Sequence, residues 1–122
     1  MFSESEIKKF RSTPTPFYYY NIETLEDTLK NVVKTSKKYG YHIHYALKAN
    51  SNNTILELIR DYGLGADCVS GNEVKKAVEC GYTNDKIVFA GVGKTDEEIN
   101  TALDADIFCF NCESIPEIEV LN

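Results

Sequence analysis

The sequence predicts an α/β fold of parallel strands and helical crossovers, equivalent to half of a TIM, or (βα)8, barrel. Short apolar runs alternate with helical patterns, and successive runs begin about 21 residues apart. Every run also ends in polar residues, which favours a barrel because barrel enzymes gather their chemistry at the carboxyl ends of the strands. With 122 residues the chain supplies about four βα units, whereas a complete barrel needs roughly 200–250 residues.

Residues 1–20 are expected to form an N-terminal lead that ends in a short strand. The first 13 residues are mostly polar, and Thr13-Pro14-Thr15-Pro16 favours an extended backbone. The aromatic run Phe17-Tyr18-Tyr19-Tyr20 is typical of a strand. The partial barrel is expected at residues 21–122 and begins with a helix whose apolar positions recur at helical spacing from Ile22 to Val33. Gly40 is expected to end that helix.

The remaining strands and helices follow from the apolar pattern in chain order. The strands are expected at residues 43–47, 66–69, 87–90 and 107–110. The helices are expected at residues 55–62, 73–80, 96–103 and 116–121, with Ser114 as the N-cap of the last. Helical connections of this kind join strands that run in the same direction, so the sheet is expected to be parallel.

The composition excludes several classes of function. The formal net charge is −6, from 19 acidic and 13 basic residues, and it disfavours binding to nucleic acid or to an anionic membrane surface. No stretch approaches the ~18 apolar residues of a membrane span. The N-terminus also lacks the basic and apolar regions of a signal peptide, so a cytoplasmic location is expected.

The cysteines and histidines do not predict a metal or redox site. The four cysteines are expected to stay reduced in the cytoplasm. Cys109 and Cys112 have C-x-x-C spacing, but Cys109 lies in an apolar run, where a cysteine acts as a small core residue. His42 and His44 share one face of a strand, yet no third ligand has a suitable context, so interior packing is expected for them.

Lys48 is the first candidate for chemistry. Strand alternation places it on the face of Ala46, opposite Tyr45 and Leu47. The large apolar face should meet the helices, so Ala46 and Lys48 should point into the barrel. A lysine amine there can form a Schiff base with a carbonyl compound, and the small Ala46 leaves space for a ligand. An exposed lysine at a strand end is the alternative interpretation.

Two carboxylates accompany the second strand. Asp67 stands in an otherwise apolar run and needs a donor such as Lys48 if it is buried; capping or a structural salt bridge is the alternative. Glu73 lies near the start of the next helix, where a carboxylate suits the helix dipole. The run Gly91-Val92-Gly93-Lys94-Thr95 lacks the glycine spacing of a nucleotide-binding loop and predicts a tight strand-to-helix turn.

Several motifs, in the same order, resemble the N-terminal part of the diaminopimelate decarboxylase family. They lie at residues 15–20, 45–51, 63–71, 86–95 and 111–114. That family belongs to the fold-type III pyridoxal-phosphate-dependent decarboxylases, which join an α/β barrel to a β-sandwich domain. The resemblance implies that the strand at residues 17–20 belongs to the β-domain of the full enzyme. It also implies that the C-terminal half of the barrel and the β-domain lie outside these 122 residues. Asn72 replaces a glycine that is usual in the family.

The resemblance also implies roles for single residues. Lys48 matches the lysine that binds pyridoxal 5′-phosphate as a Schiff base, and Asp67 matches an acidic residue close to that linkage. Ala46 and Glu73 match neighbours in the cofactor pocket. The implied reaction is decarboxylation of meso-2,6-diaminopimelate to L-lysine, a step of lysine biosynthesis in which the cofactor supplies the difficult chemistry.

Two alternatives stay open because related families share parts of this pattern. One is a decarboxylase of ornithine, arginine or carboxynorspermidine. The other is a barrel protein that binds pyridoxal phosphate without catalysis. Because the phosphate-binding loop of the family falls outside these residues, we expect this chain alone to be inactive. Its two unpaired strand edges predict self-association, such as a homodimer.

Overall fold

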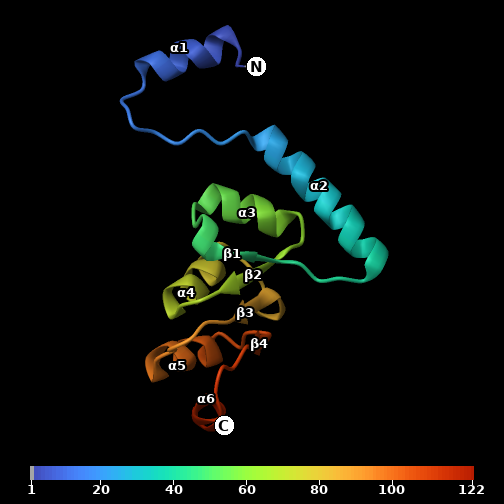
Figure 1. Ribbon diagram of the computed structural model, residues 1–122, viewed down its shortest axis with the longest axis vertical. Coiled ribbons are helices and arrows are strands. Elements are labelled where there is room, and N and C mark those ends of the chain that lie inside the picture. Colours follow the sequence, from blue (N-terminus) through green and yellow to red (C-terminus); the bar gives the residue numbers. More distant parts are fainter. Residues whose placement is uncertain (1) are drawn as a thin grey trace.

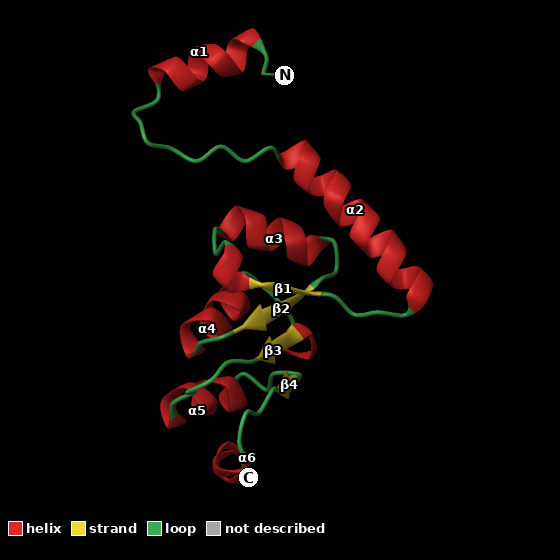
Figure 2. Cartoon of the chain, in the orientation of Figure 1, coloured by secondary structure: helices red, strands yellow, loops and turns green. Residues whose placement is uncertain are grey.

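The computed structural model describes residues 2–122 and contains a parallel sheet with the strand order β1-β2-β3-β4. The strands are β1 (His44–Ala46), β2 (Gly65–Cys68), β3 (Ile87–Phe89) and β4 (Cys109–Phe110). The helices that follow them are α3 (Asn53–Asp61), α4 (Gly71–Glu79), α5 (Asp96–Asp104) and α6 (Ile115–Leu121). Each strand is followed by a helix, as Figures 1 and 2 show, so the predicted four βα units are confirmed.

The N-terminal region differs from the expectation. A helix, α1 (Glu4–Ser12), occupies the polar lead, and Ser3 and Glu6 cap its first turn reciprocally. The strand expected at residues 17–20 is not formed in the structure, because a strand needs a hydrogen-bonded partner and this segment pairs with none among residues 2–122. The rings of Phe17 and Tyr19 instead pack against Phe10 of α1, with ring centroids 5.6 and 5.1 Å away.

Helix α2 (Ile22–Tyr39) connects this region to the sheet (Figure 1). It ends at Gly40, as predicted, where a φ of 70° favours a residue without a side chain. Leu29 of α2 packs with Ile55 and Ile59 of α3, so α2 lies against the outer side of α3. Within residues 2–122, no helix is both long enough and apolar enough to cross a membrane.

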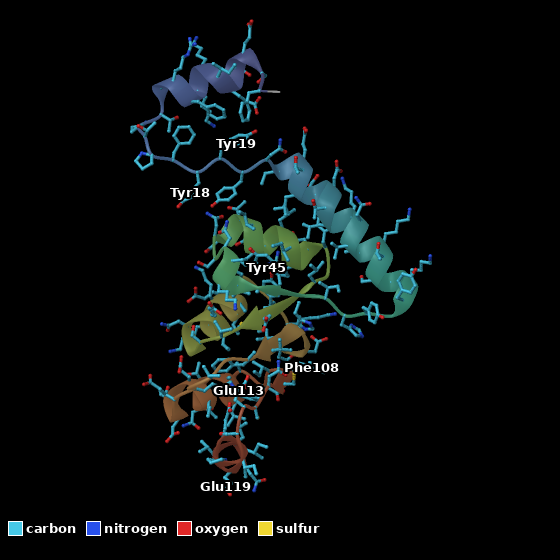
Figure 3. The ribbon with its side chains drawn as sticks, viewed as in Figure 1. Tyr18, Tyr19, Tyr45, Phe108, Glu113 and Glu119 are labelled. Carbon is cyan, nitrogen blue, oxygen red and sulfur yellow. The ribbon has the colours of Figure 1, made fainter. Side chains whose placement is uncertain are left out.

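One face of the sheet forms the main core with α3, α4 and α5. The strands contribute buried side chains to it in two rows, and the helices contribute Leu56, Val74, Ala77 and Ala102. Tyr45, labelled in Figure 3, contacts both this core and the cluster between α2 and α3. Each large side chain buried here contributes about 1.5–3 kcal/mol to folding.

The opposite face carries smaller and more polar residues. The strand register aligns one residue from each strand into a single row across the sheet: Ala46, Asp67, Val88 and Cys109. All four side chains are half-buried, whereas the strand residues that face the helices in β2 and β3 are buried. We call this row the open row, and it lies on the side that faces the interior of a closed barrel.

Candidate functional site

Lys48 lies just past the carboxyl end of β1, in a 3-10 turn formed by Leu47–Ala49. Leu47 is fully buried in the core and anchors the turn. Lys48 follows Leu47 and is exposed. Strand β1 ends at Ala46, one residue before the expected end, so the turn positions Lys48. That its side chain faces the barrel interior stays a prediction. The amine therefore lies at the carboxyl edge of the sheet, and within residues 2–122 its Nζ has no hydrogen-bond or ion-pair partner.

Ala46 and Asp67 are paired residues of β1 and β2. Adjacent strands are about 4.8 Å apart, so the Asp67 carboxylate lies one strand away from the turn that bears Lys48. Asp67 is half-buried, and in the described part of the chain it makes no hydrogen bond or ion pair. The expected pairing of Lys48 with Asp67 is therefore not formed here. A half-buried carboxylate without a donor favours a cationic group beside it.

Glu73 folds back toward the carboxyl end of β2. Its Oε2 accepts a hydrogen bond of 2.7 Å from the backbone nitrogen of Val69, the residue that follows β2. Its own backbone nitrogen donates to the N-cap side chain of Ser70 at 3.3 Å. Glu73 thus fixes the turn between β2 and α4, which is more than the favourable interaction with the helix dipole expected from the sequence.

The cysteines lie in two different environments. Burial raises the pKa of the Cys68 thiol to about 12, so this side chain stays protonated in the core. Cys109 lies half-buried in the open row rather than in the core, which corrects the prediction from its apolar neighbours. The physical reason is strand alternation, since Phe110 takes the helix side and packs against Phe89.

His44 lies on the same face as Ala46, at the other end of β1. Its Nε2 is buried and has no hydrogen-bond partner within the described residues. Burial is the main cause that lowers the pKa of His44, and the Lys86 ammonium adds to the shift. Among residues 2–122, no three His, Cys, Asp or Glu side chains are grouped so that they could hold a metal ion.

The buried position of Lys94 is a feature of the structure that the sequence did not predict. The run from Gly91 to Thr95 forms the expected turn between β3 and α5, with Thr95 as the N-cap. Within it, Lys94 is 1% exposed, and its Nζ donates to the backbone oxygens of Gly91 at 2.8 Å and Asn111 at 2.9 Å. It also forms an ion pair of 2.5 Å with Glu117 of α6. No local pattern predicts this, because the acceptors come from three separate segments.

Three of the four predicted site residues, Ala46, Lys48 and Asp67, therefore lie on neighbouring segments, and the fourth, Glu73, lies at the loop beside them. Ala46 and Asp67 are neighbours across β1 and β2, and Lys48 lies two residues beyond Ala46. Glu73 fixes the loop that begins two residues after Asp67. An accessible amine next to a small residue and an unpaired carboxylate can bind an aldehyde covalently and hold a positive charge beside it.

Comparisons with known proteins find relatives that cover nearly all of this chain. A diaminopimelate decarboxylase from Bacteroides thetaiotaomicron is 56% identical over 117 residues, which are 95% of this chain and 30% of that protein. The structure of a point mutant of the Helicobacter pylori diaminopimelate decarboxylase, complexed with L-lysine, matches with a TM-score of 0.86 and 39% identity. The match covers 95% of this chain and 29% of the Helicobacter pylori chain.

The likeness extends to a diaminopimelate decarboxylase structure from a further organism. The diaminopimelate decarboxylase from M. jannaschii, in complex with L-lysine, matches with a TM-score of 0.89 and 34% identity over 95% of this chain and 28% of that one. The chain thus spans about 30% of the length of the curated relatives it matches. These matches confirm that the four βα units are the N-terminal part of a TIM-barrel domain.

The family model extends over nearly all of the barrel portion. Residues 23–122 match the family described as "Pyridoxal-dependent decarboxylase, pyridoxal binding domain". That range contains the four strands, the Lys48 turn, Asp67 and Glu73. The chain therefore belongs to the pyridoxal-binding domain family of the pyridoxal-dependent decarboxylases.

Proposed function

We propose that this chain supplies the cofactor lysine of an enzyme that decarboxylates meso-2,6-diaminopimelate to L-lysine in lysine biosynthesis. The observation that carries the proposal is the position of Lys48. It is exposed at the carboxyl edge of β1, two residues after Ala46. Ala46 pairs with Asp67 of β2, whose carboxylate makes no hydrogen bond or ion pair among residues 2–122. The relatives with 33–56% identity support the substrate, since they are named diaminopimelate decarboxylases.

The described residues fit pyridoxal 5′-phosphate as the cofactor. The Lys48 amine is accessible to its aldehyde, and Ala46 leaves room at the sheet for a flat ring. The Asp67 carboxylate has no other partner among residues 2–122 and is available for a cationic nitrogen. When bound, the cofactor supplies an electron-withdrawing ring that takes up the electron pair left by the departing carboxyl group.

The residues of this chain have distinct tasks in the proposed reaction. Lys48 Nζ would hold the cofactor through its aldehyde carbon, in exchange with the amine of the substrate before the reaction and with that of the product after it. Asp67 would place negative charge beside the nitrogen of that linkage, which favours the protonated form of the nitrogen. Glu73, through its bond to the Val69 nitrogen, keeps the loop after β2 in one conformation.

The alternative substrates have weaker support. Structures of an arginine decarboxylase from a Chlorella virus and of an ornithine decarboxylase from Entamoeba histolytica match with TM-scores of 0.68 and 0.69. Both are 24% identical to this chain, a level at which they support the fold alone. A barrel that binds the cofactor without catalysis is distinguished from the enzyme by turnover.

Three further features complete the proposal. We propose a cytoplasmic protein that acts as a homodimer. We also propose that residues 1–20 belong to a separate N-terminal part and residues 21–122 to the cofactor-binding barrel. An extended segment between α1 and α2 supports that boundary (Figure 1).

The test is the substrate preference of the product of the complete reading frame, measured as carbon dioxide release with added pyridoxal phosphate. We expect L-lysine from meso-diaminopimelate at a rate at least about a hundredfold above that with ornithine, arginine or carboxynorspermidine. The 122-residue chain, assayed in parallel, is expected to give no turnover. A higher rate with one of the other amino acids would contradict the proposed substrate, and cofactor binding without turnover would leave a non-catalytic barrel.

A further inference from the structure

Three successive helices begin with the same arrangement of a hydroxyl N-cap and a glutamate three residues later. The pairs are Ser70 and Glu73 in α4, Thr95 and Glu98 in α5, and Ser114 and Glu117 in α6. In each helix the hydroxyl accepts a hydrogen bond from the backbone nitrogen of the glutamate. The carboxylates, however, bind different partners, so the three glutamates have different roles.

Glu98 reaches from α5 into the neighbouring βα unit. Its Oε1 accepts a hydrogen bond of 2.9 Å from the backbone nitrogen of Gly71, the first residue of α4. Its Oε2 accepts from the backbone nitrogen of Thr95 at 3.1 Å, which completes the capping box of its own helix. The bond from Gly71 is the largest cause that lowers the pKa of Glu98, so the ionised carboxylate is the form that holds the loop.

Glu98 occupies the space that a side chain at position 71 would need. A Cβ atom on Gly71 would lie 2.8 Å from Cγ and 3.1 Å from Cβ of Glu98, closer than carbon atoms normally approach. Gly71 is also buried. The absence of a side chain at this position thus permits the close approach of α5 to the start of α4.

The loop held in this way is the one that follows the candidate site. It consists of Val69 and Ser70 and begins two residues after Asp67. Glu73 binds its first residue, through the Val69 nitrogen, and Glu98 binds the residue that follows the loop, through the Gly71 nitrogen. Two carboxylates from adjacent helices therefore fix a two-residue loop from both sides at the carboxyl edge of the sheet.

We propose that Glu98 is a positioning residue of the cofactor site: by holding Gly71 it fixes the loop after β2, and with it the carboxylates of Asp67 and Glu73 relative to Lys48. The inference rests on the proposed function for the identity of the site. Glu98 acts through the loop, and its effect on the cofactor is indirect.

The test is amide hydrogen exchange of Val69 in the 122-residue chain, compared with that of Phe89 in the core. The backbone amide of Val69 donates its hydrogen bond to the carboxylate of Glu73 and not to that of Glu98. Its exchange rate therefore reports the mobility of the loop and not the loss of a direct bond to Glu98. We expect Glu98→Ala to accelerate exchange at both Gly71 and Val69 about tenfold relative to Phe89. Glu98→Gln keeps an oxygen acceptor for Gly71 and is expected to restore Val69 to within about threefold of the parent.

Glu6 supplies a matched control. It completes the capping box of α1 with Ser3, as Glu98 does with Thr95 in α5, but α1 lies away from the sheet (Figure 1). Glu6→Ala should leave the exchange of Val69 unchanged. Unchanged exchange of Val69 in Glu98→Ala, with acceleration only at Gly71, would reduce Glu98 to a local cap and overturn the proposal.

A second readout connects the loop to the cofactor. Spectroscopic titration with pyridoxal phosphate should show an affinity about fivefold weaker in Glu98→Ala than in the parent, with recovery in Glu98→Gln. An unchanged affinity together with a mobile loop would overturn the link to the site. A parent chain that does not bind the cofactor would refute the proposed function instead, and the exchange of Val69 would still decide whether Glu98 holds the loop.

Discussion

The two faces of the sheet differ although they are built from the same four strands. On the side of the helices, Phe89 and its neighbours are buried and fill the core. On the other side, the open row contains small or polar residues that are only half-buried. Because strand residues alternate between the faces, one of two neighbours in the sequence lies in the core and the other lies in the open row. A substitution on one face should affect stability, and a substitution on the other should affect chemistry.

The difference also explains the position of Lys48. Leu47, on the helix side, is fully buried and holds the turn after β1 against the core. Lys48 follows it directly and is exposed at the carboxyl edge. The core on the helix side therefore holds the turn that positions the Lys48 amine at the carboxyl edge of the sheet.

The largest expected effect is that of Lys48→Ala on turnover by the complete enzyme. Loss of the amine that holds the cofactor should reduce the rate of lysine formation by roughly a thousandfold or more. The free energy of unfolding should change by less than about 0.5 kcal/mol, because the side chain is exposed. Lys75→Ala, which removes an exposed lysine on α4, is the matched control and should leave both quantities unchanged.

The core face should respond in the opposite way. Phe89→Ala is expected to lower the free energy of unfolding by about 3–5 kcal/mol, because it removes a fully buried ring next to Phe110. Val88→Ala, one residue earlier but in the open row, should cost less than about 1.5 kcal/mol. Urea unfolding measures both changes. Equal costs at the two positions would contradict the division between the faces.

Asp67→Asn is expected to have a smaller effect and to separate chemistry from stability within the open row. Cofactor affinity should fall about tenfold, since the charge offered to a cationic nitrogen is lost. Stability should not fall, because Asp67 has no partner among residues 2–122 to lose. Asp104→Asn, at the exposed end of α5, provides the control for a general effect of charge. A loss of stability without a change in affinity would assign Asp67 a structural role.

The smallest expected effect is a change in acid sensitivity. Backbone hydrogen bonds lower the pKa of Glu98 from its usual value of 4.5, so this carboxylate stabilises the fold above that pH. The stabilisation is lost as the pH falls through the lower, folded pKa, because the unfolded chain binds the proton first. Glu98→Gln should therefore be less stable at neutral pH and lose less stability below pH 4.5 than the parent. Thermal unfolding measured across that range tests this, and parallel curves would contradict it.

Much of the fold could be predicted from local patterns. The periodicity of apolar residues located the four strands and most helices to within a few residues, and hydroxyl N-caps such as Ser114 marked where helices begin. Alternation within β1 places Ala46 on the face opposite Tyr45, but the register that aligns Ala46 with Asp67 comes from pairing between the strands. The Thr95 and Glu98 spacing of a capping box is also visible in the sequence, although its reach to Gly71 is not.

Other features depend on contacts between distant segments. The burial of Lys94 requires acceptors from the turn after β3, from the end of β4 and from α6, which come together only in the folded chain. The aromatic run at residues 17–20 predicts a strand, yet no strand among residues 2–122 pairs with it, and Phe17 and Tyr19 pack on Phe10 of α1. Figure 3 labels Tyr18 and Tyr19 on this segment. Alternation also does not predict that β1 ends at Ala46 and is followed by a 3-10 turn at Leu47–Ala49.

The role of Lys48 is tested most directly by locating the lysine that binds pyridoxal phosphate. The chain is incubated with one equivalent of the cofactor, reduced with borohydride and mapped by mass spectrometry. We expect the label on Lys48 at least about tenfold more often than on exposed lysines such as Lys75, and we expect Lys48→Arg to abolish it. A label distributed evenly over the exposed lysines, or one that persists in Lys48→Arg, would show that Lys48 is not the cofactor lysine.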